Sequence, residues 1–131
     1  MEYLFVYGTL RRGTTHRAES RKSDGTLYAR FLEQFATYIG EAKTDGRIHL
    51  IKDYPGFVDG KGIVVGDLYT VSTKVLKTMD EYEGKEFERL KRDVEGPAGV
   101  VDSWIYVYAY NVTGKERIQS GDWVAHLANP S

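Results

Sequence analysis

Two short segments of the sequence carry the residue types best suited to binding and transforming a small molecule. The first is Tyr7, Gly8, Thr9 and Leu10, followed by two arginines and a glycine. Glycine lets the backbone approach a ligand closely, and successive exposed N–H groups form a concavity that binds carboxylates. Taken alone, a strand that ends in Tyr-Gly-Thr is more often a plain turn. The second segment ends in Glu83, whose chemistry depends on where the carboxylate points.

Glu83 is the last residue of a helix that we expect over residues 73–83. A step of about 100° per residue places Tyr82, Met79 and Leu76 in one apolar arc. Glu83 falls between Met79 and Leu76, whereas the lysines of the helix lie on the opposite side. The pattern therefore predicts that Glu83 points with the core-facing side chains.

A carboxylate in that position has an unusual acidity. Burial and the negative end of the helix dipole both raise the pKa of Glu83. A carboxyl group tuned toward neutrality can accept and donate a proton near pH 7, as a general acid/base must. The helical wheel alone leaves an alternative open, in which Glu83 reaches solvent at a frayed helix end or pairs with Arg89 or Arg92.

Four motifs, which follow one another in a fixed order, resemble those of one known family. They are Tyr-Gly-Thr-Leu-Arg-Arg-Gly at 7–13, Asp-Tyr-Pro-Gly-Phe at 53–57, Val-Gly-Asp-Leu-Tyr-Thr-Val at 65–71, and Met-Asp-Glu-Tyr-Glu-Gly at 79–84 with Phe-Glu-Arg at 87–89. In order and spacing they are similar to the gamma-glutamylcyclotransferase-like family, in particular its small gamma-glutamylamine cyclotransferase-type members. Residues 104–110 and 121–123 fit the C-terminal half of that family, so the resemblance spans nearly the whole chain. Two departures are mild: Met79 replaces a leucine, and Phe87 replaces a common tyrosine.

The resemblance implies a fold, an activity and a set of site residues. The implied fold is α+β, a small mixed, mostly antiparallel β-barrel flanked by a few helices. In such a protein the loop of Tyr7, Gly8, Thr9 and Leu10 holds the glutamyl part of the substrate, largely through backbone groups, and Glu83 is the acid/base. The expected enzyme is a gamma-glutamyl cyclotransferase, of acyltransferase or lyase type, that releases 5-oxoproline from a gamma-glutamyl amide without a cofactor.

A gamma-glutamyl amide carries its own nucleophile, which suits a chain without cysteine. Its α-amine attacks the δ-carbonyl, closes a five-membered ring and expels an amine, while Glu83 moves the proton between the two nitrogens. The alternative function is a non-catalytic or redirected member of the same fold that binds a small acidic metabolite. The intact Glu83 argues against this alternative, because a pure binder gains nothing from a buried acid. The sequence does not identify the leaving group.

Alternating hydrophobicity and turn residues predict the strands that must position these groups. We expect strands over residues 2–7, 47–51, 63–71, 88–94 and 103–112. A further short strand is expected at 37–41. Gly66 indicates a bulge or a close backbone approach within its strand. Turns are expected at 61–62 and 95–101, where glycine and proline gather.

Two helices are predicted from apolar residues at helical spacing. The first covers the repeat between residues 27 and 35, with Ser23 or Asp24 as its N-cap. The second, over 73–83, is capped by Ser72 or Thr73, and Gly84 ends it.

Tyrosine is the most frequent aromatic residue, with 10 against 5 phenylalanines and 2 tryptophans. Because a buried tyrosine needs a partner for its hydroxyl, we expect a β-rich protein with a half-polar interior. Trp104, Tyr106, Tyr108 and Tyr110 share one face of the last strand, and the other face is also bulky. This strand is therefore expected to be central in the sheet or part of a closed barrel.

Composition limits the class of protein. The 131 residues, which are 41% hydrophobic and contain no cysteine, suit a single domain over 1–131 without disulfides or thiolate metal sites. Because 18 basic residues nearly balance 19 acidic ones, we expect no nucleic-acid partner. His16, His49 and His126 have no metal-ligand spacing, so no metal is expected. We expect a cytoplasmic protein, without membrane association, that acts on a small molecule as a monomer or weak homodimer.

A basic stretch follows the first motif and bears on the leaving group. It contains Arg11, Arg12, Arg17, Arg21 and Lys22. It is either a solvated loop and helix start, or a rim that attracts a second carboxylate of the substrate. We expect the walls around the leaving group to come from residues 11–30 and 95–101.

Overall fold

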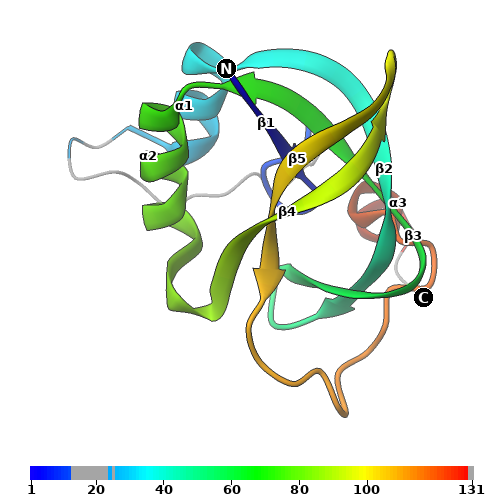
Figure 1. Cartoon of the computed structure of the whole chain (residues 1–131). Helices are drawn as coiled ribbons and strands as arrows, with labels where there is room; N and C mark the ends of the chain where they lie inside the picture. The colour runs from blue at the N-terminus through cyan, green and yellow to red at the C-terminus, as the bar shows by residue number, and fades with distance from the viewer. Residues whose placement is uncertain (13–23, 25, 130–131) are drawn as a thin grey trace.

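Five strands close into a barrel, and helices lie against its outside (Figure 1). The computed structural model describes residues 1–12, 24 and 26–129. The elements are β1 Glu2–Val6, α1 Tyr28–Phe35, β2 Thr37–Leu50, β3 Pro55–Val71, α2 Thr73–Glu83, the 3-10 turn η1 Gly84–Glu86, β4 Phe87–Gly96, β5 Gly99–Tyr108 and α3 Trp123–Ala128. Figure 1 shows α1 and α2 together on one side of the barrel and α3 on another. The α+β class expected from the sequence is confirmed.

The barrel is mixed and mostly antiparallel. Its strands follow the order β1-β3-β2-β4-β5, and additional pairing joins β3 to β5. The pairs β1–β3, β2–β3, β2–β4 and β4–β5 are antiparallel, whereas β5 runs parallel to β1 and to β3. β5 thus pairs with three strands, which confirms that the last strand is central or part of a closed barrel, but its bounds differ from the expected 103–112 because it begins at Gly99 and ends at Tyr108.

Strands β2 and β3 form one long hairpin that the sequence predicts only in pieces. The short strands expected at 37–41 and 47–51 are parts of the single strand β2, whose register shifts between Asp45 and Arg47. The turn expected at 61–62 is wrong, because these residues lie within β3. Opposite Asp45 and Arg47, the partners on β3 are Ile63 and Val58, so the glycine-rich residues between them form an irregular bulge instead of reversing the chain.

The expected boundaries of α2 are confirmed. The Ser72 hydroxyl accepts a hydrogen bond from the Val75 N–H at 3.2 Å, and Gly84 follows the helix with φ of 72°. α1 has no side-chain cap at its N-cap residue Leu27. Asp24 instead accepts a hydrogen bond from the Thr26 N–H at 2.9 Å, and Ser23, the other expected cap, lies outside the described residues.

Two apolar cores lie on opposite faces of the strands. The barrel interior contains Phe5, Ile48, Phe57, Leu68, Val94 and Ile105. The second core lies between the barrel and the helices α1 and α2, and contains Leu4, Leu32, Tyr69, Leu76, Met79 and Tyr106. The buried tyrosines are divided unevenly between the two cores, since Tyr7 lies in the otherwise mostly aliphatic and phenylalanine interior of the barrel, and Tyr28, Tyr69 and Tyr106 lie in the second core. The tyrosine face of β5 points to the helix side instead, and Tyr110, beyond the end of β5, is 58% exposed.

A close approach between β1 and β3 fixes the end of β1. A Cβ atom on Gly66 would lie 2.4 Å from the carbonyl oxygen of Val6 and 2.6 Å from the ring of Phe5. Only glycine fits at this position, as the sequence indicates. The chain leaves β1 directly after this contact and enters the turn of the first motif.

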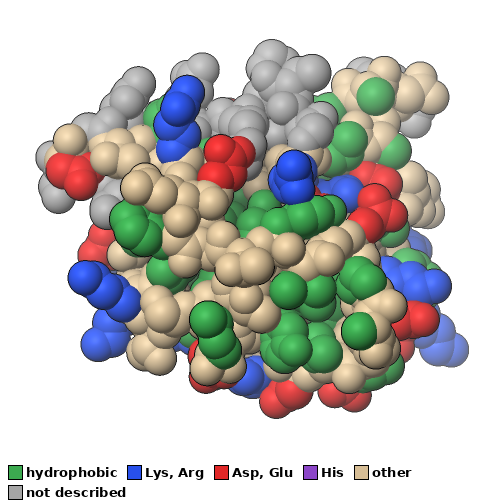
Figure 2. Space-filling model, turned by 90° about the horizontal axis from the view of Figure 1, so that it is seen from above, with side chains coloured by type: hydrophobic (Ala, Val, Ile, Leu, Met, Phe, Trp, Pro, Cys, Tyr) green, Lys and Arg blue, Asp and Glu red, His purple; other side chains and the backbone are tan. Residues whose placement is uncertain are grey.

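The outer surface carries both signs of charge. Figure 2 shows Lys and Arg side chains next to Asp and Glu side chains on one face, with small apolar groups between them. Within the part of the chain that the structure describes, no helix has the length and apolar character needed to cross a membrane.

Candidate functional site

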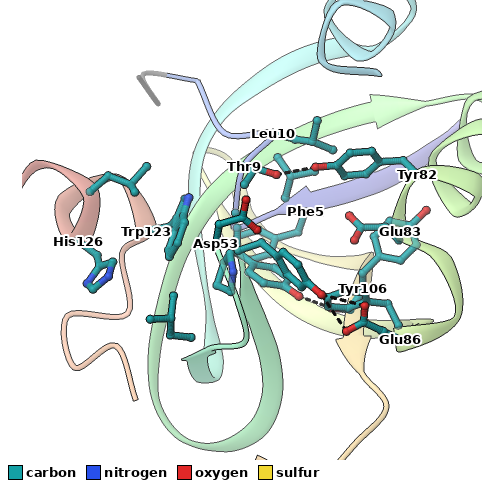
Figure 3. A pocket seen from close by; sticks show the side chains of 18 residues that line it. Phe5, Thr9, Leu10, Asp53, Tyr82, Glu83, Glu86, Tyr106, Trp123 and His126 are labelled. Carbon is teal, nitrogen blue, oxygen red and sulfur yellow. Dashed lines mark hydrogen bonds between the residues drawn. The ribbon is translucent and has the colours of Figure 1, made fainter. Parts of the chain in front are cut away.

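A pocket of about 760 Å³ opens beside the end of β1 (Figure 3). Its wall comes from the turn after β1, the β2–β3 loop, the end of α2 with η1, the strand β5 and the helix α3. The site residues expected from the sequence all line this pocket: Tyr7, Gly8, Thr9, Leu10 and Glu83. The fold thus brings together two segments that are more than 70 positions apart in the sequence.

The turn after β1 presents backbone N–H groups. The Arg11 N–H donates to the carbonyl of Gly8 at 3.0 Å, which closes a tight turn around Thr9 and Leu10. In the described part of the chain, the N–H groups of Thr9 and Leu10 have no acceptor. Such neighbouring free N–H groups suit a carboxylate. A Cβ atom on Gly8 would lie 3.0 Å from Cγ of Pro55, so glycine here also allows the β2–β3 loop to approach.

A buried arginine fixes this turn to the rest of the barrel. Arg11 is 4% exposed and forms an ion pair of 2.7 Å with Asp122, the N-cap residue of α3. Its Nε lies 3.8 Å from Asp67 on β3, which also accepts a hydrogen bond from the Arg12 N–H at 2.7 Å. Burial raises the pKa of Asp67. The network holds the turn between β3 and α3.

The two described arginines of the basic stretch, Arg11 and Arg12, do not form a rim of the pocket. Arg11 is buried, and the Arg12 guanidinium lies 4.3 Å from the centre of the Tyr38 ring. Neither arginine lines the pocket. Arg17, Arg21 and Lys22 lie outside the described residues.

Glu83 points into the pocket, as the helical wheel indicates (Figure 3). Both alternative partners are engaged elsewhere, because Arg89 pairs with Asp80 at 2.7 Å and Arg92 pairs with Asp59 at 2.8 Å. Among the described residues, the Glu83 carboxyl has no hydrogen-bond or ion-pair partner.

The surroundings of Glu83 make it a weak acid. Burial, and secondarily the charge of Asp80, raise the pKa of Glu83 from 4.5 to about 8. The side chain keeps some accessible surface because it forms part of the pocket wall. A carboxyl group with a pKa near neutrality is suited to move protons.

Four tyrosines surround the site, and each hydroxyl is already paired. The Tyr7 hydroxyl donates to the Tyr106 carbonyl at 2.7 Å, and the Tyr106 hydroxyl donates to Asp80 at 2.7 Å. The Tyr54 hydroxyl donates to the Glu86 carboxylate at 2.8 and 2.9 Å. The Tyr82 hydroxyl pairs with the Thr9 hydroxyl at 2.6 Å. Burial raises the pKa of all four phenols, to about 12 for Tyr82. They act as fixed, neutral walls, and the pair of Thr9 and Tyr82 ties the turn to α2.

One wall of the pocket comes from residues that the sequence does not reveal. His126, for which the sequence gives no functional role, lines the pocket with Trp123 and Leu127 of α3. The His126 ring stacks on Trp123 with 5.4 Å between the ring centres. The wall expected from residues 95–101 is wrong, since none of them lines this pocket. The Gly-Asp-Trp motif at 121–123 is the one sequence signal that points to α3.

The remaining histidines do not contribute to the pocket lining that the structure describes. His49 lies on β2 with Nδ1 3.1 Å from the Lys115 carbonyl, away from the pocket lining, and His16 lies outside the described residues. Within the described ranges, no group of three or more His, Cys, Asp or Glu side chains could hold a metal ion.

Comparison with known proteins identifies the family. The chain matches the family described as gamma-glutamyl cyclotransferase, AIG2-like, over residues 4–125. A relative from Vibrio cholerae is 33% identical over 124 residues, which cover 94% of this chain and 96% of that one. The gamma-L-glutamyl-butirosin B gamma-glutamyl cyclotransferase of Niallia circulans is 31% identical over 116 residues, or 82% of this chain and 67% of that one. The crystal structure of YkqA from Bacillus subtilis is similar over 95% of this chain, with a TM-score of 0.71 at 26% identity, and this chain spans 40% of it. Since the match runs from β1 to α3 and includes every motif around the pocket, the chain belongs to the gamma-glutamyl cyclotransferase, AIG2-like, family.

Proposed function

We propose that this protein releases 5-oxoproline from a gamma-glutamyl amide, with Glu83 as the general acid/base. The observation that carries the proposal is the Glu83 carboxyl, which has no partner among the described residues and lies in the same pocket as a turn whose N–H groups have no acceptor among them. Membership of the cyclotransferase family supports it, as does the relative from Niallia circulans, which is named for acting on gamma-L-glutamyl-butirosin B.

The reaction exchanges one C–N bond for another and transfers two protons from the attacking nitrogen to the leaving nitrogen. Ionised Glu83 accepts a proton from the α-ammonium of the substrate, and the resulting amine attacks the δ-carbonyl. A new C–N bond closes the five-membered lactam, and the C–N bond to the leaving amine breaks. Glu83 gives this proton to the leaving nitrogen, then takes the second proton from the ring nitrogen and passes it to the departing amine, which leaves as an ammonium, so Glu83 ends in its starting state. No protein nucleophile takes part.

The pocket contributes by holding the substrate in a curled conformation. Two ends of one molecule held at attack distance gain up to about 7–11 kcal/mol in favourable intramolecular cases. We assign the binding of the glutamyl carboxylate to the backbone N–H groups of Thr9 and Leu10, with Tyr7 and Gly8 shaping the turn. The phenols of Tyr7 and Tyr106 are fixed by their own hydrogen bonds and form the wall against which the chain curls.

The raised pKa of Glu83 matches this task. An ordinary carboxylate is too weak a base to remove a proton from an ammonium group, whereas a carboxylate with a pKa of about 8 is much closer to it. The positive charge of the bound ammonium favours the ionised form of Glu83 at the moment of binding.

The remaining expectations are part of the same proposal. One domain over residues 1–131 accords with the closed barrel, because one continuous set of strands carries both cores. A monomer or weak homodimer, the absence of a cofactor and a cytoplasmic location stay predictions from the sequence.

The experiment is a substrate panel with 5-oxoproline as the readout. The panel contains gamma-glutamyl amino acids, gamma-glutamyl-ε-lysine and glutathione. We expect Glu83→Gln to lower kcat by about 100-fold or more and to remain folded, while Glu81→Gln, which alters an exposed carboxylate on the same helix, keeps its activity. Full turnover by Glu83→Gln would remove Glu83 from this role. Binding of gamma-glutamyl compounds without product would support the alternative of a redirected binding protein.

A further inference from the structure

Asp80 joins three elements directly behind the site. Its Oδ1 accepts hydrogen bonds from the Tyr106 hydroxyl and from Arg89 Nε, each at 2.7 Å. Its Oδ2 accepts from Arg89 Nη2 at 3.1 Å. Asp80 lies on α2, Arg89 on β4 and Tyr106 on β5, and Asp80 precedes Glu83 by three residues, which places the two carboxylates on neighbouring turns of one helix face.

The bond from Tyr106 to Asp80 decides which donors Glu83 can reach. Tyr106 is 4% exposed and lies beside Glu83 in the pocket wall (Figure 3). A phenol has a single proton to donate, and Asp80 takes it. The backbone carbonyl of Tyr106 in turn takes the proton of Tyr7. Two phenols of the pocket wall are therefore directed away from Glu83 by one connected set of bonds.

The negative charge of Asp80 also raises the pKa of Glu83, and other charged groups lie near the site. Asp80 on α2, Asp53 in the β2–β3 loop and Glu86 on η1 are carboxylates, and Asp53 and Glu86 line the same pocket. Arg89 on β4 is the nearby cation, and its guanidinium is held by Asp80 in a two-bond fork. It also lies 4.3 Å from the centre of the Trp104 ring, which fixes it on the side of the barrel away from the pocket lining.

We propose that Asp80 is a positioning residue for Glu83, because it holds the Tyr106 hydroxyl and the Arg89 guanidinium away from the Glu83 carboxyl and adds a negative charge one helical turn from it. This inference rests on the proposed role of Glu83. Its consequence is that the substrate ammonium is the first positive donor that Glu83 meets. The bond network thereby keeps Glu83 a strong enough base for the reaction.

Two substitutions break the same ion pair and separate this role from a merely structural one. Asp80→Asn removes the negative charge, so the titration midpoint of Glu83 is expected to fall by roughly one pH unit. Arg89→Gln removes the positive charge and leaves Asp80 uncompensated, so the midpoint is expected to rise. A purely structural role predicts similar losses of stability in both variants and no opposite movement of the midpoint.

The measurement is an NMR titration of 13C-labelled glutamate carboxyl groups, in which the Glu83 signal is identified by its loss in Glu83→Gln. This readout needs no turnover, so it is independent of whether the wild-type protein forms 5-oxoproline. A matched control is Asp59→Asn, because Asp59 and Arg92 form the same kind of two-bond fork at 2.8 Å on strands β3 and β4. We expect Asp59→Asn to leave the titration midpoint of Glu83 unchanged.

The outcomes distinguish the two proposals. Opposite shifts of the Glu83 titration midpoint in Asp80→Asn and Arg89→Gln support the positioning role. If no substrate of the panel yields 5-oxoproline, that result overturns the proposed function but not the positioning role. Unmoved midpoints, or shifts in the same direction, overturn the positioning role even if the enzyme is active. If Asp80→Asn does not fold, Arg89→Gln alone tests the inference. An unchanged or lowered titration midpoint of Glu83 in Arg89→Gln contradicts it.

Discussion

The protonation of Glu83 should make the stability of the protein fall as the pH rises. In the unfolded chain Glu83 ionises at its usual pKa of 4.5, and in the folded protein at about 8. Between these values the unfolded chain has lost a proton that the folded protein retains. The free energy of unfolding therefore decreases with pH across this window, and the Glu83 contribution is fully present only below about pH 4.5.

The size of the effect follows from the width of the window. One proton of difference corresponds to about 1.4 kcal/mol per pH unit, so the full interval sets an upper limit of about 5 kcal/mol. Because Glu83 lines an open pocket, solvent reduces this value. We expect Glu83→Gln, which cannot ionise, to gain about 2 kcal/mol or more over the wild type between pH 5 and pH 8.

Urea unfolding at pH 5, 6, 7 and 8, followed by tryptophan fluorescence, measures this difference. Glu88→Gln is the control, since it removes an exposed carboxylate on β4 that does not line the pocket. A difference between wild type and Glu83→Gln that stays constant from pH 5 to pH 8 would refute the reasoning, because it would mean that Glu83 ionises at an ordinary pKa in the folded protein.

Three further predictions concern the turn and the pocket opening. Gly8→Ala, whose Cβ would lie 3.0 Å from Pro55, should raise KM for gamma-glutamyl substrates with little change in Tm, as steady-state kinetics and thermal unfolding can show. Thr9→Val and Tyr82→Phe each remove the 2.6 Å hydrogen bond between them, so each should lower the free energy of unfolding by about 1 kcal/mol, and a double-mutant cycle should show that the losses do not add. Asp53→Asn should lower kcat/KM about threefold for substrates with a positively charged leaving amine but not for glutathione, because Asp53 is an exposed carboxylate of the pocket lining.

The sequence predicts the strands and helices well where apolar residues alternate or repeat regularly, and less well where glycine interrupts this apolar pattern. α2 is confirmed to the residue because Ser72 and Gly84 are strong local signals at its two ends. The sequence predicts β2 and β3 only in pieces, because Gly46, Gly60 and Gly62 interrupt the apolar pattern where the hairpin has its bulge. In a long hairpin the partner strand supplies the hydrogen bonds that hold such residues extended, and no local pattern contains this information.

The sequence predicts a site residue where the type of the side chain is unusual for its position in a local pattern. Glu83 could be recognised because a charged residue on an apolar helix face is an anomaly that needs a reason. The wall formed by Trp123 and His126 could not, since a long segment without helix or strand separates α3 from β5, and its path across β2 and β3 depends on isolated backbone bonds. The pairing of Asp80 with Tyr106 likewise joins residues whose proximity only the closed barrel creates.

The tyrosines explain why an acid can remain unpaired in this pocket. A phenylalanine wall would exclude water but would remove one donor each from the carbonyl of Tyr106 and the carboxylate of Asp80, and the Tyr54 donor from the carboxylate of Glu86. Losing such donors costs free energy in a buried site. The hydroxyls of Tyr7, Tyr54 and Tyr106 donate to these acceptors, and a phenol that donates to one of them has no proton left for Glu83. The same residues therefore stabilise the folded barrel and maintain the destabilised carboxyl group on which the proposed chemistry depends. Stability and activity are coupled here through shared hydrogen bonds, so a substitution such as Tyr106→Phe should affect both together.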